Sequence, residues 1–242
     1  MLGYPDAALR DAERALKDAR EVGQAASLMY ALTHTCFIHI TCGIYDQANA
    51  EIDELISLAE EKASPFWQAL GMLHRGYLTA LTGTTAEAVN TITTALTVFR
   101  STGSRMWEPL YSAHLSYTHA KLGQFEEASR CIDEAMGTIE TTKEKWFEAE
   151  MCRIAGEIAL LSPQLGVASA ETHFERALAI ARQQQAKSWE LRAAMSMARL
   201  WRDQGKREEA RELLAPVYGW FTEGFDTLDL KDAKALLDQL AA

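Results

Sequence analysis

The sequence predicts an all-α fold in which helical hairpins of about 40 residues stack into an elongated solenoid. Glycine recurs every 40 residues, at Gly3, Gly43, Gly83 and Gly123. An alanine stands five residues after each glycine, and this alanine column extends along the chain through Ala8, Ala48, Ala88, Ala128, Ala170 and Ala210. Apolar residues between these markers keep a helical spacing. Units of this length bury their apolar faces only by stacking, so one continuous array is expected.

The first predicted helix runs from Gly3 to Gly23, with Pro5 in its first turn. It matches the second helix of each later hairpin, so the first repeat is expected to lack its own first helix. That absence leaves an apolar face for another segment or another chain to cover. Further helices are expected over residues 25–42, 45–61, 65–82, 85–103, 106–122, 125–140, 145–161, 168–185, 188–204, 207–215 and 228–240.

Several boundaries have a specific chemical signal. Glu87 and Glu144 complete predicted capping boxes with Thr84 and Thr141. Pro109 is expected to kink or delay its helix. The turn 162–166 absorbs two extra residues where the period lengthens to 42, and Pro216 with Gly219 bends or breaks the helix before the last. We expect residues 1–225 to form the solenoid, and 226–242, beginning at the helix cap Asp226, to cover its open end.

Composition excludes several function classes. The chain has 48% hydrophobic and 24% charged residues, which is typical of a globular protein. Its net charge of −10 makes nucleic acid and anionic membrane surfaces poor partners. No signal peptide or membrane-spanning run is visible. The four cysteines lack CxxC or framework spacing, which favours reduced thiols in the cytoplasm. No cofactor motif is found.

Close helix packing is indicated by a column of small residues on the first helices: Cys36, Gly76, Ser116, Gly156 and Ala198. This small-x6-Gly-x4-Ala-x6-Ala skeleton resembles tetratricopeptide repeats with unusually long helices. The resemblance implies a right-handed α-α superhelix. The long helices and the C-terminal segment also resemble the repeat region of bacterial signal-transduction ATPases, adenylate cyclase fusions and ATP-dependent transcription activators. No GxxxxGK[ST] phosphate loop is present, so their catalysis is not expected here.

In tetratricopeptide proteins the first helices line the concave groove, and the resemblance places three residue columns there. The N-terminal half of this groove would be aromatic and aliphatic, and suits an apolar ligand or a peptide. The C-terminal half would be charged. The groove candidates are Tyr30, Phe37, Leu70, Leu73, Tyr77, Leu110, Tyr117, Glu150, Arg153, Glu157, Arg192, Arg199 and Arg202.

The charged half has two interpretations. Glu150 shares a column with Arg192, and Glu157 shares one with Arg199, so salt bridges between neighbouring helices account for them. Alternatively, the arginines together bind a carboxylate or phosphate of a small anionic molecule. A tryptophan column at Trp67, Trp107, Phe147 and Trp189 is predicted to pack against the preceding second helices.

A polar ladder, His34, His74 and His114, is also spaced by 40 residues. It suits either pH sensing or partly buried histidines bonded to neighbours. Stacked helices lie about 8–10 Å apart, which is too far for metal binding unless side chains converge. No metal site is therefore predicted.

The leading hypothesis is a non-catalytic scaffold or regulatory module that binds a peptide or protein partner in the groove. The alternative is a small-molecule sensor domain of a larger ATPase, cyclase or transcription activator. Homo-oligomerisation through the uncovered N-terminal helix is compatible with both. An enzyme is not predicted, because no nucleophile and base, or pair of carboxylates, has a spacing better than chance.

Overall fold

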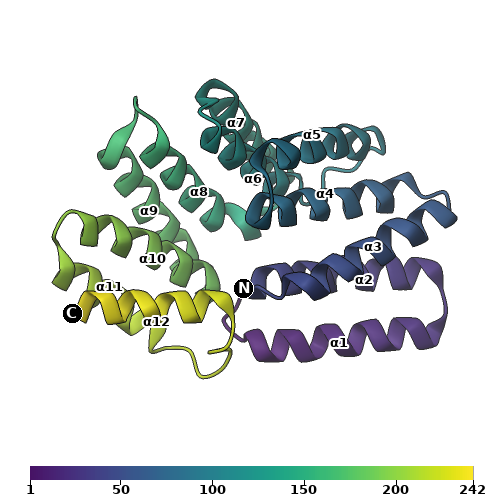
Figure 1. Ribbon diagram of the computed structural model, residues 1–242, viewed down its shortest axis with the longest axis horizontal. Helices are drawn as coiled ribbons and strands as arrows, with labels where there is room; N and C mark the ends of the chain where they lie inside the picture. Colours follow the sequence, from purple (N-terminus) through teal and green to yellow (C-terminus); the bar gives the residue numbers. More distant parts are fainter. Residues whose placement is uncertain (242) are drawn as a thin grey trace.

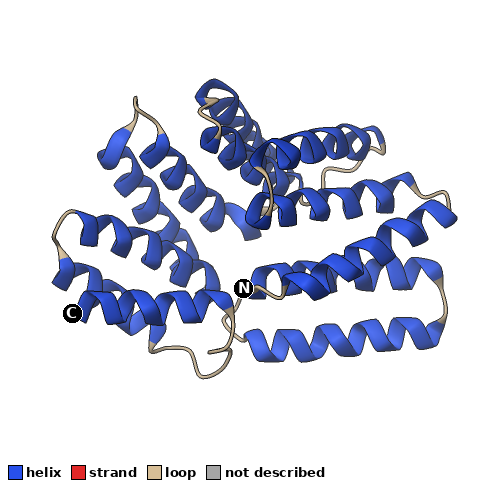
Figure 2. Cartoon of the chain, in the orientation of Figure 1, coloured by secondary structure: helices blue, strands red, loops and turns tan. Residues whose placement is uncertain are grey.

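The computed structural model describes residues 1–241 and confirms an all-α superhelical solenoid (Figures 1 and 2). No strand occurs within this range. Twelve α-helices and one 3-10 turn, η1, account for its secondary structure. They are α1 Pro5–Val22, α2 Ala25–Cys42, α3 Tyr45–Glu61, α4 Pro65–Thr82, α5 Thr85–Ser101, α6 Glu108–Lys121, α7 Phe125–Thr142, η1 Lys145–Phe147, α8 Glu148–Leu161, α9 Gly166–Gln183, α10 Lys187–Asp203, α11 Arg207–Tyr218 and α12 Leu228–Ala241.

The hairpin turns follow from the periodic glycines, with one exception. Gly43 has φ of 80°, and its N–H donates to the carbonyl of Ile40 at 3.1 Å while Ile44 N–H donates to that of His39 at 2.8 Å. This pattern closes the last turn of α2 with a left-handed residue, for which glycine has no steric cost. Gly83 instead is extended, with φ of −115°. The glycine period therefore marks the turns without imposing one backbone conformation on them.

Some predicted boundaries were wrong in detail. Pro109 was predicted either to kink its helix or to delay its start. The start is delayed, because α6 begins at Glu108. The helix predicted over 145–161 divides into η1 and α8. Helix α7 continues to Thr142, so Glu144 does not begin a helix by capping with Thr141. Helix α11 runs through Pro216 to Tyr218.

Small residues allow the helices of each hairpin to approach closely. A Cβ built on Gly76 would lie 2.5 Å from Cγ1 of Ile92 and 3.2 Å from its backbone nitrogen. Ser116 donates its hydroxyl to the carbonyl of Ala128 at 2.5 Å. The alanines of the second-helix column at 48, 88, 128, 170 and 210 are completely buried. These contacts are the reason for the small-residue columns.

The two ends of the solenoid meet, and we call these contacts the clasp. Figure 1 shows the N-terminus beside α10 and α12, far from the C-terminal end of α1. The N–H of Ala7 donates to Oε1 of Glu223 at 2.9 Å, and the N–H of Gly224 donates to Oδ2 of Asp6 at 3.0 Å. Ser188 N–H also donates to the Met1 carbonyl at 3.0 Å. The superhelix thus closes on itself, which the repeat pattern did not predict.

The last helix packs on α10 and α11. Its buried side chains are Leu230, Ala233, Leu236 and Leu240. Leu237 is only partly buried, and Leu236 is buried beside it. The apolar end of the array is therefore covered as α12 turns back along it.

Candidate binding chamber

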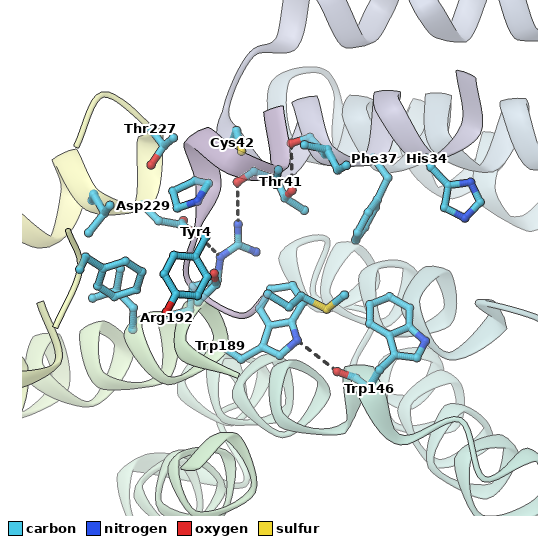
Figure 3. A pocket seen from close by; sticks show the side chains of 18 of the residues that line it. Tyr4, His34, Phe37, Thr41, Cys42, Trp146, Trp189, Arg192, Thr227 and Asp229 are labelled. Atoms are coloured by element: carbon cyan, nitrogen blue, oxygen red, sulfur yellow. Dashed lines mark hydrogen bonds and ion pairs between the residues drawn. The ribbon is translucent and has the colours of Figure 1, made fainter. Parts of the chain in front are cut away.

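The clasp encloses a cavity of about 440 Å³ on the concave side, which we call the chamber (Figure 3). Its walls come from both ends of the chain and from the middle: α1 and α2, the residues just before α6, η1, α10 and α12. Most of its surface is apolar. The apolar lining includes Phe37, Trp107, Trp146, Trp189, Leu191 and Leu230.

Three aromatic rings form one wall. The Phe37 ring centroid lies 5.4 Å from that of Trp107 and 6.0 Å from that of Trp146, and the two indoles are 6.1 Å apart. The rings are tilted or edge-on to one another, which is a favourable arrangement for aromatic pairs. Trp189 is tied to this wall because its Nε1–H donates to the Trp146 carbonyl at 3.1 Å. These residues offer a rigid apolar contact surface.

Glu144 positions two of the indoles. Its carboxylate accepts the backbone N–H of Trp107 at 3.1 Å and Nε1–H of Trp146 at 2.7 Å. Trp107 has φ of 61°, a left-handed conformation that is costly for a bulky residue. The carboxylate therefore compensates an unfavourable backbone and orients a neighbouring ring. The sequence indicated only a capping role for Glu144, because the bond from Trp107 to Glu144 spans 37 residues.

Arg192 closes one side of the chamber and binds three separate helices. It donates to Oδ2 of Asp229 at 2.7 Å, to Oε1 of Glu150 at 3.3 Å and to the carbonyl of Thr41 at 3.2 Å. Burial alone would lower the pKa of Arg192, but the carboxylates of Asp229 and Glu150 outweigh it and raise the pKa above its ordinary value. The guanidinium is thus charged, mostly shielded from solvent and neutralised within the protein.

A smaller polar cavity of about 180 Å³ lies on the other side of Arg192. Arg192 and Asp229 line both cavities and so separate them. His114 lines the smaller one; burial lowers its pKa to about 3, so its ring is neutral, and its Nε2 is buried without a hydrogen-bond partner in the described structure. Tyr77, 2% exposed, lies against it with ring centroids 4.1 Å apart.

The aromatic half of the predicted groove is only partly at the surface. Phe37 reaches the chamber, Tyr117 is half-buried under the Lys121 ammonium, and Tyr30 is exposed. In contrast, the groove assignment was wrong for three leucines that lie entirely in the core: Leu70, Leu73 and Leu110. All three belong to the main hydrophobic cluster of the solenoid.

The charged half forms an internal network, as the salt-bridge interpretation requires. Arg153 donates twice to Glu150 at 2.8 Å and once to Glu157 at 3.1 Å. The expected pairing of Glu150 with Arg192 is confirmed, but Glu157 pairs with Arg153 and not with Arg199. Arg199 approaches Asp232 at 4.0 Å, and Arg202 bonds Asp203 at 2.9 Å. Acids therefore already pair with Arg153, Arg192 and Arg202, three of the four arginines proposed to bind an anionic ligand.

The histidine ladder does not converge. His34 packs on Trp107 with centroids 5.0 Å apart, while His74 contacts Trp107 and Tyr111 at 5.9 and 5.7 Å. Aromatic rings thus surround these imidazoles. Among residues 1–241, no group of three His, Cys, Asp or Glu side chains has a geometry suited to a metal ion.

The tryptophan column separates into two roles. Trp189 and Phe147 are buried, as a core column should be, but Trp189 also lines the chamber. Trp107 is half-buried and faces the chamber together with Trp146, which lies outside the column. The tryptophan column in the sequence therefore included residues of the site, but the prediction that these residues only fill the core was wrong. Asp229 and Tyr4 were missed because they reach the chamber only when the ends meet.

The fold and the chamber define a helical-repeat protein with a partly open apolar site where its two ends meet. A family model for anaphase-promoting complex subunit 5 matches residues 4–66, 63–107 and 109–147, which together are more than half of the chain. The chain belongs to this family. Consecutive matches to one model also confirm a repeating helical unit along this part of the chain.

Two solved structures share the fold. The apo form of RapI has a TM-score of 0.67 and 14% identity, and the alignment covers 96% of this chain and 77% of that one. BtubC (BKLC) from P. vanneervenii has a TM-score of 0.59 and 17% identity, with 98% and 89% covered. At these identities the likeness concerns architecture alone. No curated protein sequence matches, and no helix within residues 1–241 is long and apolar enough to cross a membrane.

Proposed function

We propose that this chain is a non-catalytic interaction module whose chamber holds an apolar side chain of a peptide or protein partner. The single observation that carries the proposal is the 440 Å³ cavity walled by Phe37 and three indoles. Aromatic anchors in a desolvated pocket dominate protein-binding energies. The cavity also lies within the roughly 300–1,000 Å³ range of ligand sites.

The charges around the chamber support a neutral occupant. Arg192 is satisfied by Asp229, Glu150 and a backbone carbonyl, so an anion would have to displace an internal carboxylate. Removing one partner of a buried ion pair is strongly unfavourable. We therefore propose an aromatic or large aliphatic side chain as the occupant, in place of the small anionic molecule.

The indoles supply the test. A displayed library of random peptides is selected against the protein, and binding of enriched peptides is followed by tryptophan fluorescence. Trp146→Ala should weaken binding at least about tenfold, since a buried aromatic anchor is worth roughly 2 kcal/mol or more. Trp201→Ala is the matched control, because Trp201 bonds Glu171 away from the chamber. Equal affinities in the two variants would contradict the proposal.

A small-molecule sensor role remains the second candidate, and the enclosure of the chamber favours it. In that case neutral aromatic metabolites should raise the melting temperature in proportion to the logarithm of their concentration, whereas no peptide would be enriched. The resemblance to signal-transduction ATPases and cyclases supports this candidate. The four free cysteines support the proposed reducing, cytoplasmic location in either case.

A further inference from the structure

Helix α1 carries an alanine face that is more exposed than the same face in later repeats. Ala15 is exposed and Ala8 is half-buried. Their counterparts are buried: Ala48 and Ala88 are 0% exposed and Ala95 is 4% exposed. In those repeats the first helix of the hairpin covers this face. Within the described chain, no first helix precedes α1.

A matching face of α2 is uncovered as well. Tyr30, His34 and Ile38 are spaced by four residues and so lie on one side of the helix. Tyr30 is 58% exposed, whereas its counterparts Leu70 and Leu110 are entirely buried. His34 and Ile38 are half-buried, although the residues at their positions in each later first helix are buried. The stack of first helices therefore ends at α2, and the side of α2 that carries Tyr30, His34 and Ile38 has no neighbouring first helix to cover it in the described chain.

The two uncovered faces form the walls of one groove, which we call the first-helix groove. A cavity of about 690 Å³ lies between them, lined by Ala12, Ala15 and Ala19 of α1, by the α2 stripe, and by Trp67 at its far side. His34 and Ile38 line both this cavity and the chamber, so the two adjoin. Helix α2 has 18 residues, about 27 Å. The lining of the groove runs from Ala26 to Ile38 on α2, about 18 Å, so the groove has room for about three turns of a helix.

We propose that the first-helix groove binds an amphipathic α-helix of a partner protein, which takes the place of a first helix before α1. This inference rests on the proposed function and specifies the form of the partner segment. The position is the next one in the series α2, α4, α6, α8 and α10, whose members contact one another along the concave face. Helix-in-groove binding through residues at i, i+4 and i+7 suits such a site.

The groove specifies the chemistry of that helix. Later repeats place a large side chain, such as Ile52 or Ile92, where α1 has Ala12. The partner is therefore expected to present large apolar residues toward α1 and to fill the space that these side chains occupy elsewhere. Among the described residues lining the groove, Asp11 carries the only formal charge at pH 7 with histidine neutral, which favours flanking Lys or Arg.

Charge also distinguishes the partner from a second copy of this chain. Each copy carries a net charge of −10. Two copies would repel each other over long range at low salt, whereas a basic amphipathic helix would be attracted. These charges favour a basic amphipathic helix over a second copy of this chain as the occupant of the groove.

The test compares two displayed libraries: random residues on one face of a rigid helical scaffold, and random extended peptides. Helical binders should be enriched, and Ala15→Arg should weaken them at least about tenfold by filling the groove. Ala50→Arg is the matched control: Ala50 is exposed on α3, and the residue at its position in α1 is Arg10. Tyr30→Ala should weaken the same binders without adding bulk.

Each other outcome overturns the inference in a recognisable way. Extended binders that are lost in Trp146→Ala but retained in Ala15→Arg would leave the proposed function intact and reject the helix. A dimer that forms across micromolar concentrations and dissociates in Ala15→Arg would assign the groove to a second copy. Enrichment from neither library would contradict both the inference and the proposed function. Unchanged helicity and melting temperature establish that Ala15→Arg is folded.

Discussion

Single small residues decide how closely the helices pair. Gly76 sits against Ile92 so tightly that an added methyl group would meet its side chain and its backbone nitrogen. Gly137, by contrast, lies within α7 with nothing within 4 Å of where its Cβ would be. The same substitution therefore has opposite consequences at these two positions.

Gly76→Ala should lower the free energy of unfolding by about 1–3 kcal/mol, because overpacking exceeds the gain in helix propensity. Gly137→Ala should raise it by up to about 1 kcal/mol, since only the propensity changes. Urea unfolding monitored by circular dichroism measures both. If Gly76→Ala stabilised the protein, α4 and α5 would be able to move apart enough to accommodate the added methyl group without cost.

Buried histidines make stability depend on pH. The pKa of His74 and that of His114 are lowered by burial from 6.5 to about 3, so the folded protein holds both rings neutral. The unfolded chain binds more protons between these values, and stability must fall as the pH falls below about 6.5. We expect a loss of roughly 2 kcal/mol per histidine between pH 7 and pH 5.

Urea unfolding at pH 7, 6 and 5 tests this dependence, with His74→Gln as the comparison. In the variant, the part of the pH dependence of the unfolding free energy that comes from His74 and His114 should fall by about half. Parallel pH profiles for the two proteins would show that the pKa of His74 is the same in the folded and unfolded states, which would contradict its lowering by burial.

At the scale of elements, the start of α6 and the turn η1 are built around Glu144. One carboxylate accepts from the backbone of Trp107 and from the indole of Trp146, and so joins two elements that form one wall of the chamber. This arrangement was not predictable from the repeat, because Glu144 has the spacing of a capping box with Thr141. The spacing of Thr141 and Glu144 favoured a capping interaction between them, but Glu144 instead accepts the backbone N–H of the distant Trp107.

Glu144→Ala should destabilise the protein by about 1–2 kcal/mol, since two N–H groups lose a charged acceptor. It should also change the tryptophan emission and weaken any chamber ligand, because both indoles lose their orientation. Glu140→Ala is the control, as Glu140 is exposed one turn earlier on α7. Identical emission spectra in the two variants would refute the positioning role.

At the scale of the molecule, closure of the superhelix creates the chamber. The sequence predicted the helices, their pairing and the array, since these depend on contacts between neighbours that repeat every 40 residues. It did not predict the clasp, whose bonds from Asp6 and Glu223 span more than 200 residues. The curvature accumulates from small rotations at every hairpin, and no single residue encodes it. The sequence therefore predicted Phe37 as a groove residue, but it did not predict Trp146 and Asp229, which line the chamber together with Phe37.

Replacing both clasp acids, Asp6→Ala with Glu223→Ala, should open the superhelix, because each accepts a backbone N–H from the opposite end. We expect a larger radius of gyration by small-angle X-ray scattering and a loss of about 1–3 kcal/mol in stability. Glu21→Ala with Glu212→Ala is the matched control, because it makes the same change of net charge at exposed sites on α1 and α11. An unchanged radius in the clasp variant would mean that apolar contacts alone hold the ends together.

Repeat arrays ordinarily unravel from their tips, since a terminal unit has one neighbour where an inner unit has two. Here the first and last turns of the coil hold each other through Asp6, Glu223 and Gly224. Fraying at this junction therefore requires these backbone hydrogen bonds to break. Amide hydrogens of Ala7 and Gly224 should then exchange with solvent as slowly as those at the centre of the chain, and a cut anywhere in the ring should loosen both ends together.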